Sequence, residues 1–216
     1  MPPVRIPPSM PVERAVDRAI RLSIRQTAEW FNENVRAVAS LAYGQIGGQS
    51  DLLLSICGEK YVHYELFKRL RTHLPRVPEY RPFREVGAGR PRRGGREPRV
   101  DLAVSRGSDP ERDRTNAAAI EVKVGYVPFD SHSRDPGVPQ GWSRDTRPYA
   151  SDFAKAAVSI RAKLRRFGAG YLVVLGYYGD DTGWGDVEED WKEDFERALD
   201  SLLRDSIVVW WNRRFL

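Results

Sequence analysis

Two short runs of alternating residues, 99–105 and 119–125, constrain the fold of this chain most. Each alternates branched apolar residues with charged or small ones, which is typical of a β-strand whose two faces meet different surroundings. The apolar positions are Val100, Leu102 and Val104 in the first run and Ile120, Val122 and Val124 in the second. Because successive side chains of a strand point to opposite faces, pairing the two runs would bring Asp101, Glu121 and Lys123 together on the other face.

These three charged residues would form one polar patch on the sheet. Their neighbours on that face include Ala103 and Ala119, which are small and would leave the patch open. Two carboxylates and an ammonium group can hold a divalent cation beside a phosphate. The alternative is a ladder of cross-strand ion pairs on a half-exposed sheet. Because Asp is disfavoured in strands, we favour the functional interpretation.

Periodicity along the rest of the chain predicts an α/β fold. We expect an extended proline-rich arm over 1–11, a helix from Val12, a helix from about Gln49 or Asp51 to Leu74, strands at 79–86, 171–178 and 207–211, a helix from Ser151 and a helix over 188–204. The apolar run 171–178 suits a strand buried on both faces, and the helix before it predicts that it runs parallel to the 119–125 strand. The two alternating runs predict an antiparallel hairpin. The expected architecture is a mixed β-sheet flanked by helices over 59–216, preceded by an arm and a helical extension over 1–58.

Basic residues point to a polyanionic partner without requiring one. Lys and Arg together number 35 against 30 for Asp and Glu, and the pI is about 9.4. The segment 87–98, rich in Gly, Arg and Pro, predicts a flexible basic loop. Within it Arg92, Arg93 and Arg96 are candidates for phosphate contact, and Lys155 is a further candidate near the start of the helix from Ser151.

Asp101 followed by Glu121-Val122-Lys123, with Glu65 on the helix before them, resembles the PD-(D/E)xK nuclease superfamily. The proline of the pattern is displaced, because Arg99 and Val100 separate Pro98 from Asp101. The resemblance covers about 59–211 in the order of elements and implies a restriction-endonuclease-like fold. It also implies that Asp101, Glu121 and the backbone carbonyl of Val122 bind Mg²⁺, for which Mn²⁺ is a possible substitute. Lys123 would serve the attacking water, and Glu65 would complete the site or bind a second metal ion.

Two further expectations concern individual side chains of this site. A partly dry site would lower the pKa of Lys123, because burial penalises the charged ammonium. His63 and His73 lie too far apart on their helix for a metal pair with i, i+4 spacing, so we interpret both as structural.

We therefore expect a Mg²⁺-dependent phosphodiesterase that cuts DNA as an endonuclease. The alternatives are a non-catalytic nucleic-acid-binding or assembly subunit of the same fold, and an RNA nuclease. The single cysteine, Cys57, excludes an internal disulfide and fits a reducing compartment, so the expected location is cytoplasmic. The longest apolar runs fall well short of the roughly 20 residues of a membrane helix, so no membrane partner is expected. A homodimer is an expectation by analogy with enzymes that cut both strands of DNA.

Overall fold

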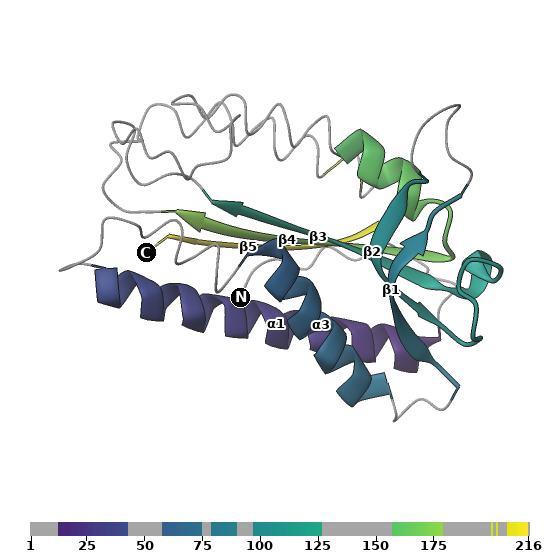
Figure 1. Ribbon diagram of the computed structural model, residues 1–216, viewed down its shortest axis with the longest axis horizontal. Coiled ribbons are helices and arrows are strands. Elements are labelled where there is room, and N and C mark those ends of the chain that lie inside the picture. Colours follow the sequence, from purple (N-terminus) through teal and green to yellow (C-terminus); the bar gives the residue numbers. More distant parts are fainter. Residues whose placement is uncertain are drawn as a thin grey trace.

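The computed structural model describes residues 13–42, 58–74, 79–89, 97–126, 157–178, 200, 202 and 207–215. Their elements are α1 (Arg14–Ala42), α3 (Glu59–His73), β1 (Arg81–Gly87), β2 (Arg99–Ser105), the short 3₁₀ helix η2 (Arg114–Asn116), β3 (Ala118–Tyr126), β4 (Ala169–Tyr178) and β5 (Ile207–Phe215). Residues 157–164 are also helical. A single sheet lies between α1 and α3 on one side and helix 157–164 on the other (Figure 1).

The five strands form one mixed sheet in the order β1-β2-β3-β4-β5. β1, β2 and β3 pair in antiparallel fashion, whereas β3, β4 and β5 run parallel. The predicted hairpin of β2 and β3, the parallel pairing of β3 with β4 and the α/β class are therefore confirmed. The change from antiparallel to parallel pairing occurs at β3, the strand that carries Glu121 and Lys123.

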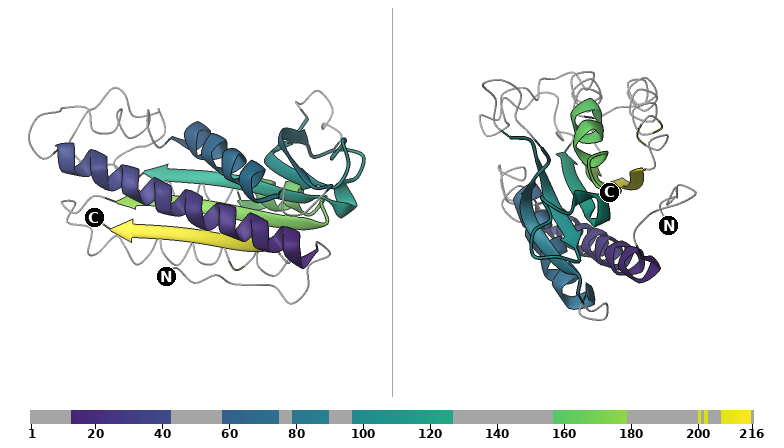
Figure 2. Two further views of the ribbon diagram at one scale, coloured as in Figure 1. Left: turned by 90° about the horizontal axis from the view of Figure 1, so that it is seen from below. Right: turned by 90° about the vertical axis from the view of Figure 1, so that its right-hand side faces the viewer.

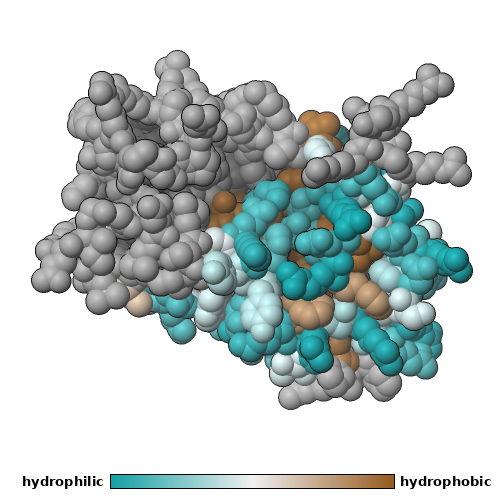
Figure 3. All heavy atoms as spheres, in the orientation of Figure 1, coloured by the Kyte–Doolittle hydropathy of each residue, from teal (hydrophilic) through white to brown (hydrophobic). Residues whose placement is uncertain are grey.

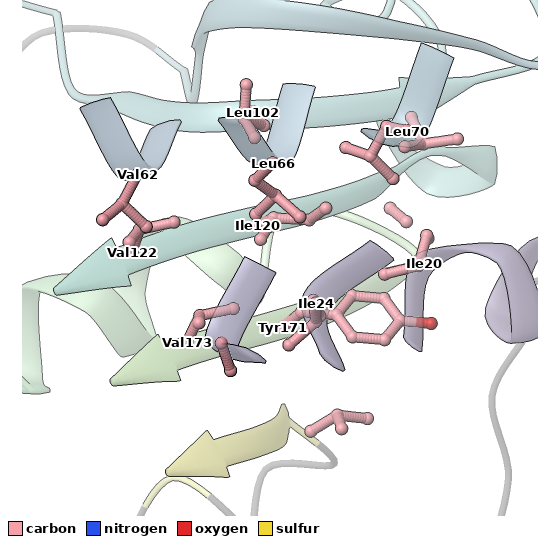
Figure 4. Close-up of a cluster of buried hydrophobic side chains, with 14 of the residues drawn as sticks. Ile20, Ile24, Val62, Leu66, Leu70, Leu102, Ile120, Val122, Tyr171 and Val173 are labelled. Atoms are coloured by element: carbon pink, nitrogen blue, oxygen red, sulfur yellow. The ribbon is translucent and has the colours of Figure 1, made fainter. Parts of the chain in front are cut away.

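Helices α1 and α3 lie side by side across one face of the sheet (Figure 2). Their apolar stripes share one core with the sheet, in which Ile20 and Ile24 of α1 and Leu66 of α3 pack near Ile120 and Tyr171 (Figure 4). All five side chains are almost fully buried. Such burial is worth about 1.5–3 kcal/mol for a large apolar side chain. The N-terminal helix thus belongs to the same core as the sheet.

The opposite face of the sheet is also covered. Ile160 and Leu164 of helix 157–164 are buried with Leu172 and Val174 of β4, and Ala119 of β3 joins the same cluster. From the sequence, this face was expected to be open around the charged residues. That expectation is wrong around Glu121 and Ala119, where small side chains on the sheet let the helix approach closely, whereas Asp101 and Lys123 keep 18% and 28% of their side chains exposed.

The observed helices and strands agree with the predicted ones to within a few residues where both can be compared. The predicted arm over 1–11 and the start of the second helix at Gln49 or Asp51 lie outside the described residues, as does most of the helix predicted over 188–204. Among the described residues, no helix is both long and apolar enough to cross a membrane.

Candidate functional site

The candidate site lies where β2 separates from β3. The two strands are paired from Val104 opposite Ala118 to Leu102 opposite Ile120, and their pairing ends there. β2 continues beside β1, but that register omits the pair formed by Glu85 and Asp101, and Glu85 has a φ of 50°. The β1–β2 ribbon therefore bends at Asp101 and leaves the edge of β3 beyond Ile120 without its neighbour.

The bend also corrects the predicted faces of β2. Val100 was expected to share a face with Leu102 and Val104. It packs instead with Ala103 on the side of helix 157–164, while Leu102 and Val104 face α1 and α3. Strict alternation is lost at Asp101 because the strand turns away from β3 at that residue.

Asp101 occupies the gap that this bend creates. Its Oδ2 accepts a hydrogen bond of 2.7 Å from the backbone N–H of Val122, which has no strand partner on that side among the described residues. The same oxygen lies 3.3 Å from Nε2 of His63. Burial by itself raises the pKa of the Asp101 carboxyl, but His63, Lys123 and the Val122 N–H together outweigh it and hold that pKa below its usual value. Asp101 is therefore an ionised carboxylate at neutral pH.

Glu121 is the most deeply buried charged group of the site, with 2% of its side chain exposed. Burial raises its pKa, and repulsion from the nearby Asp101 carboxylate raises it further, while Lys123 and Lys163 oppose both effects. Oε1 of Glu121 lies 3.6 Å from Nζ of Lys123 and accepts a short hydrogen bond from Lys163. Its other oxygen, Oε2, is buried and accepts no hydrogen bond from the part of the chain that the structure describes.

Lys123 bridges the two sides of the sheet. Its Nζ donates a hydrogen bond of 3.1 Å to Oε1 of Glu59 on α3 and also lies close to Glu121. The expected fall in its pKa does not occur. Burial lowers that pKa, but the carboxylates of Glu121, Glu59 and Asp101 outweigh burial and raise it. Without a bound cation, Lys123 is therefore a firmly protonated ammonium group.

Helix α3 contributes two residues that sequence reasoning did not assign to the site. Glu59 lies in its first turn, and His63 follows one turn later, 3.8 Å from the Glu59 carboxylate. Glu59, His63 and Asp101 each offer one ligand atom, and these three atoms lie within 4.8 Å of one another. The i, i+4 spacing of Glu59 and His63 was visible in the sequence, but only a pairing between the two histidines was considered there.

Glu65, the acid that the resemblance selected, lies elsewhere on the same helix. Its Oε1 is 2.8 Å from Nη2 of Arg69, and its Oε2 is 3.1 Å from Nζ of Lys68. Within the described residues, no contact joins Glu65 to Asp101. The structure thus brings Asp101, Glu121 and Lys123 together and sets Glu65 in an ion pair on α3.

Lys163 reaches the site from the helix on the far face of the sheet. Besides Glu121, its Nζ donates a hydrogen bond of 3.0 Å to the backbone carbonyl of Arg99. Only 16% of its side chain is exposed. Only the docking of this helix against the sheet shows that the Lys163 side chain turns inward to Glu121.

These residues fit a divalent cation. Asp101 and Glu121 are close enough for mutual repulsion, and a cation between carboxylates relieves such repulsion. The buried Oε2 of Glu121 is an oxygen ligand that no described group engages. Carboxylates, with one imidazole from His63, form a donor set that Mg²⁺ or Mn²⁺ accepts. The remaining candidates for phosphate contact, Arg92, Arg93, Arg96 and Lys155, lie outside the described residues.

Comparison with known proteins adds no relative. No family model, no curated protein and no solved structure matches this chain. The resemblance to the PD-(D/E)xK superfamily therefore depends on the residues of this chain and on their arrangement.

Proposed function

We propose that this protein is a metal-dependent phosphodiesterase of restriction-endonuclease-like fold. More particularly, we propose a nuclease that cuts DNA as an endonuclease. The observation that supports the proposal most is the joint position of Asp101, Glu121 and Lys123 at the gap between β2 and β3, with one buried carboxylate oxygen of Glu121 that has no hydrogen-bond partner among the described residues. A purely structural ion-pair ladder gives no reason for that unpaired oxygen, because an unsatisfied buried polar group costs free energy.

Asp101, Glu121 and the carbonyl of Val122 would hold the cation. When bound, Mg²⁺ or Mn²⁺ would neutralise charge that develops on the phosphate and lower the pKa of an attacking water. The Val122 N–H fixes the orientation of the Asp101 carboxylate through its hydrogen bond. Burial of Glu121 removes competing solvent from its oxygens.

Lys123 and Glu59 would handle the proton and the phosphate charge. In the free protein, Glu59 holds the Lys123 ammonium by a hydrogen bond of 3.1 Å, which positions it beside Glu121. Charge on a cation at the carboxylates would offset the field that now raises the pKa of Lys123. Lys123 would then orient the attacking water and stabilise the negative charge on phosphorus oxygens. We propose that Glu59, rather than Glu65, is the helix acid that supports this group.

The proposal is tested by incubating the purified protein with supercoiled plasmid and with labelled RNA, with Mg²⁺, Mn²⁺ or EDTA. Wild type is compared with Asp101→Asn, Lys123→Ala and two matched variants of α3, Glu59→Gln and Glu65→Gln. We expect metal-dependent DNA cleavage by wild type and at least about a hundredfold loss for Asp101→Asn and Lys123→Ala, since each removes one cooperating group of the reaction.

The two glutamate variants decide which acid of α3 matters. We expect Glu59→Gln to lower the cleavage rate by about tenfold or more, because it removes the carboxylate that positions the Lys123 ammonium by a hydrogen bond. Glu65→Gln should lower the free energy of unfolding through the loss of its pairs with Arg69 and Lys68, with a much smaller effect on cleavage. Cleavage of RNA alone would favour the RNA nuclease. Equal activity in all variants, or none in wild type on either substrate, would refute the enzymatic proposal and favour a non-catalytic subunit.

A further inference from the structure

The outward side of α3 combines cations with aromatic side chains. Its exposed residues are Lys60, Tyr61, Tyr64, Lys68, Arg71 and Thr72. At about 100° per residue, these six positions fall within roughly 120° of the helix circumference and span about 18 Å along its axis. Three are cations, two are aromatic and none is acidic. We call this set the outer face of α3.

The two tyrosines are the most informative residues of the outer face. Tyr61 and Tyr64 are 49% and 57% exposed, and the only other large apolar or aromatic residue exposed to this degree among the described residues is Val158. Exposed side chains of this size carry a free-energy cost in water unless something covers them. Placed three positions apart on a helix, the two rings are neighbours.

Cations surround the two rings. Lys60 and Arg71 have no carboxylate partner within 4 Å among the described residues, whereas Lys68 pairs with Glu65. The basic surface extends to the edge strand β1, where the exposed Arg84 lies over the ring of Phe67 at 6.0 Å from its centre. Figure 3 views the molecule from the side on which α3 and β1 lie in front, and the surface there is predominantly hydrophilic.

The outer face is also continuous with the candidate site. His63 lies three positions after Lys60, and residues three apart are neighbours on a helix surface, so the outer face borders the site residues of α3. A strand lying along the outer face would therefore reach the gap between β2 and β3 at the N-terminal end of α3.

We infer that the outer face of α3 binds single-stranded nucleic acid, with unpaired bases stacked on Tyr61 and Tyr64 and phosphates near Lys60 and Arg71. The inference rests on the proposed function, because it names single-stranded nucleic acid as the substrate of the proposed nuclease site. Stacking on aromatic rings requires bases with free faces, which a continuous duplex does not offer. An acidic polypeptide would match the cations but would gain little from two flat rings. The unpaired strand of a junction, flap or melted region is the substrate form that both features fit.

The test measures binding in EDTA, so that no cleavage occurs. Fluorescence anisotropy follows a short fluorescein-labelled DNA strand of mixed sequence, the same strand as duplex, and fluorescein-labelled poly-glutamate. The key variant is Tyr61→Ala with Tyr64→Ala, which leaves a good helix former at both positions. Its matched partner is Tyr61→Phe with Tyr64→Phe, which keeps both rings. Arg112→Ala is a charge control, since Arg112 is highly exposed and lies on the connection between β2 and β3.

Loss of one base stack weakens binding by roughly 5- to 150-fold, so we expect the double alanine variant to bind the single strand at least about tenfold more weakly. The double phenylalanine variant and Arg112→Ala should stay within about threefold of wild type, and duplex binding should change by less than about twofold. Lys60→Ala with Arg71→Ala should weaken binding of the single strand and reduce the slope of log K against log salt by about 0.7 for each cation. Circular dichroism melting of each variant reports whether the fold is kept.

Unchanged single-strand binding by a folded double alanine variant, an equal loss for duplex, or stronger binding of poly-glutamate than of DNA would each overturn the inference. Failure of the proposed function is distinguishable from these results. A wild type that binds single strands through its tyrosines but never cleaves them would refute the nuclease and leave the binding surface standing. A wild type that cleaves DNA, together with a double alanine variant that keeps its cleavage rate and its affinity for the single strand, would refute the binding surface and leave the nuclease standing.

Discussion

Replacing Lys163 with Met tests whether the Lys163 ammonium stabilises the buried Glu121 carboxylate. A bound metal cation could take over that role. Met keeps most of the length and apolar character of the Lys stem but removes the ammonium group. In the wild type, the Lys163 ammonium forms an ion pair with Oε1 of Glu121 and donates a hydrogen bond to the backbone carbonyl of Arg99. After the change, the Glu121 carboxylate, which is 2% exposed, keeps Lys123 as its one close cation among the described residues.

The magnitude follows from what remains in place. Removal of one partner from a buried ion pair typically costs about 3–5 kcal/mol. Here Nζ of Lys123 stays 3.6 Å from Oε1 of Glu121, and Lys163 is itself 16% exposed, so we expect about 2 kcal/mol of lost stability at neutral pH, below that range. The combination of Lys163→Met with Glu121→Gln should recover most of the loss, because no buried charge is then left without its partner.

The loss should depend on pH with a defined sign. The pKa of Glu121 is raised in the folded protein above the ordinary value of 4.5, so the native state binds the proton more tightly than the unfolded state does. The free energy of unfolding therefore falls as the pH rises from about 4.5 to the pKa of Glu121 in the folded protein. Above that pKa, Glu121 causes no further change of the free energy of unfolding with pH. Lys163→Met raises the folded pKa further. The difference between variant and wild type should thus be small below pH 4.5 and largest at neutral pH.

Urea unfolding followed by tryptophan fluorescence at acidic and neutral pH measures these differences, and repetition with Mg²⁺ or Mn²⁺ adds the cation. A cation that binds only the folded state should stabilise the variant more than wild type, since it replaces the missing ammonium. Equal stability of variant and wild type at neutral pH would refute the buried ion pair. A pH-independent loss would refute the role given to the Glu121 carboxylate.

Two other substitutions test the frame around the site. Tyr171→Phe removes a hydroxyl that donates a hydrogen bond of 2.7 Å to Asp17, and it should cost about 1–2 kcal/mol in urea unfolding. Burial, and then Asp17, raise the pKa of Tyr171 above its ordinary value of 10. The stabilisation by the Tyr171 hydroxyl should therefore be complete below pH 10 and decline above it. An equal stability difference between wild type and Tyr171→Phe at higher pH would contradict the hydrogen bond to Asp17. Gly168→Ala should destabilise the fold by about 1–3 kcal/mol, because a Cβ there would lie 2.0 Å from a backbone oxygen, whereas the control Gly107→Ala meets its nearest atom at 3.9 Å. Equal melting temperatures for the two alanine variants would contradict the close packing at Gly168.

Much of this architecture was predictable because it depends on local periodicity. Alternation along 119–125 fixed which side chains of β3 face α1 and α3, and the structure shows Ile120 and Val122 in that core. The continuous apolar run of β4 predicted burial on both faces, as Tyr171 and Leu172 show by packing into opposite clusters. Period-2 and period-3.6 patterns report the direction of a side chain relative to its own element, and that direction survives packing.

The alternation of apolar residues in the sequence could not predict the position at which β2 bends and its side chains change face. Val100 changes face because β2 bends at Asp101, and the bend depends on the positive φ of Glu85 in the neighbouring strand. The pKa of Lys123 was expected to fall with burial, but three carboxylates from three elements raise it. Glu121 is near Lys123 in sequence, but Glu59, Asp101 and the bend at Glu85 are partners distant in sequence, which a local pattern does not contain.

The sequence by itself determined the α/β class, the mixed pairing of the central strands and the candidacy of Asp101, Glu121 and Lys123. Only the tertiary structure decided which side chains join them. Glu59 and Glu65 both lie on α3, but the way this helix docks against the sheet brings Glu59 to Lys123 and leaves Glu65 with Arg69. The physical reason is that a helical pattern specifies which stripe is buried, whereas the position of each turn along the sheet is set by the packing of whole elements.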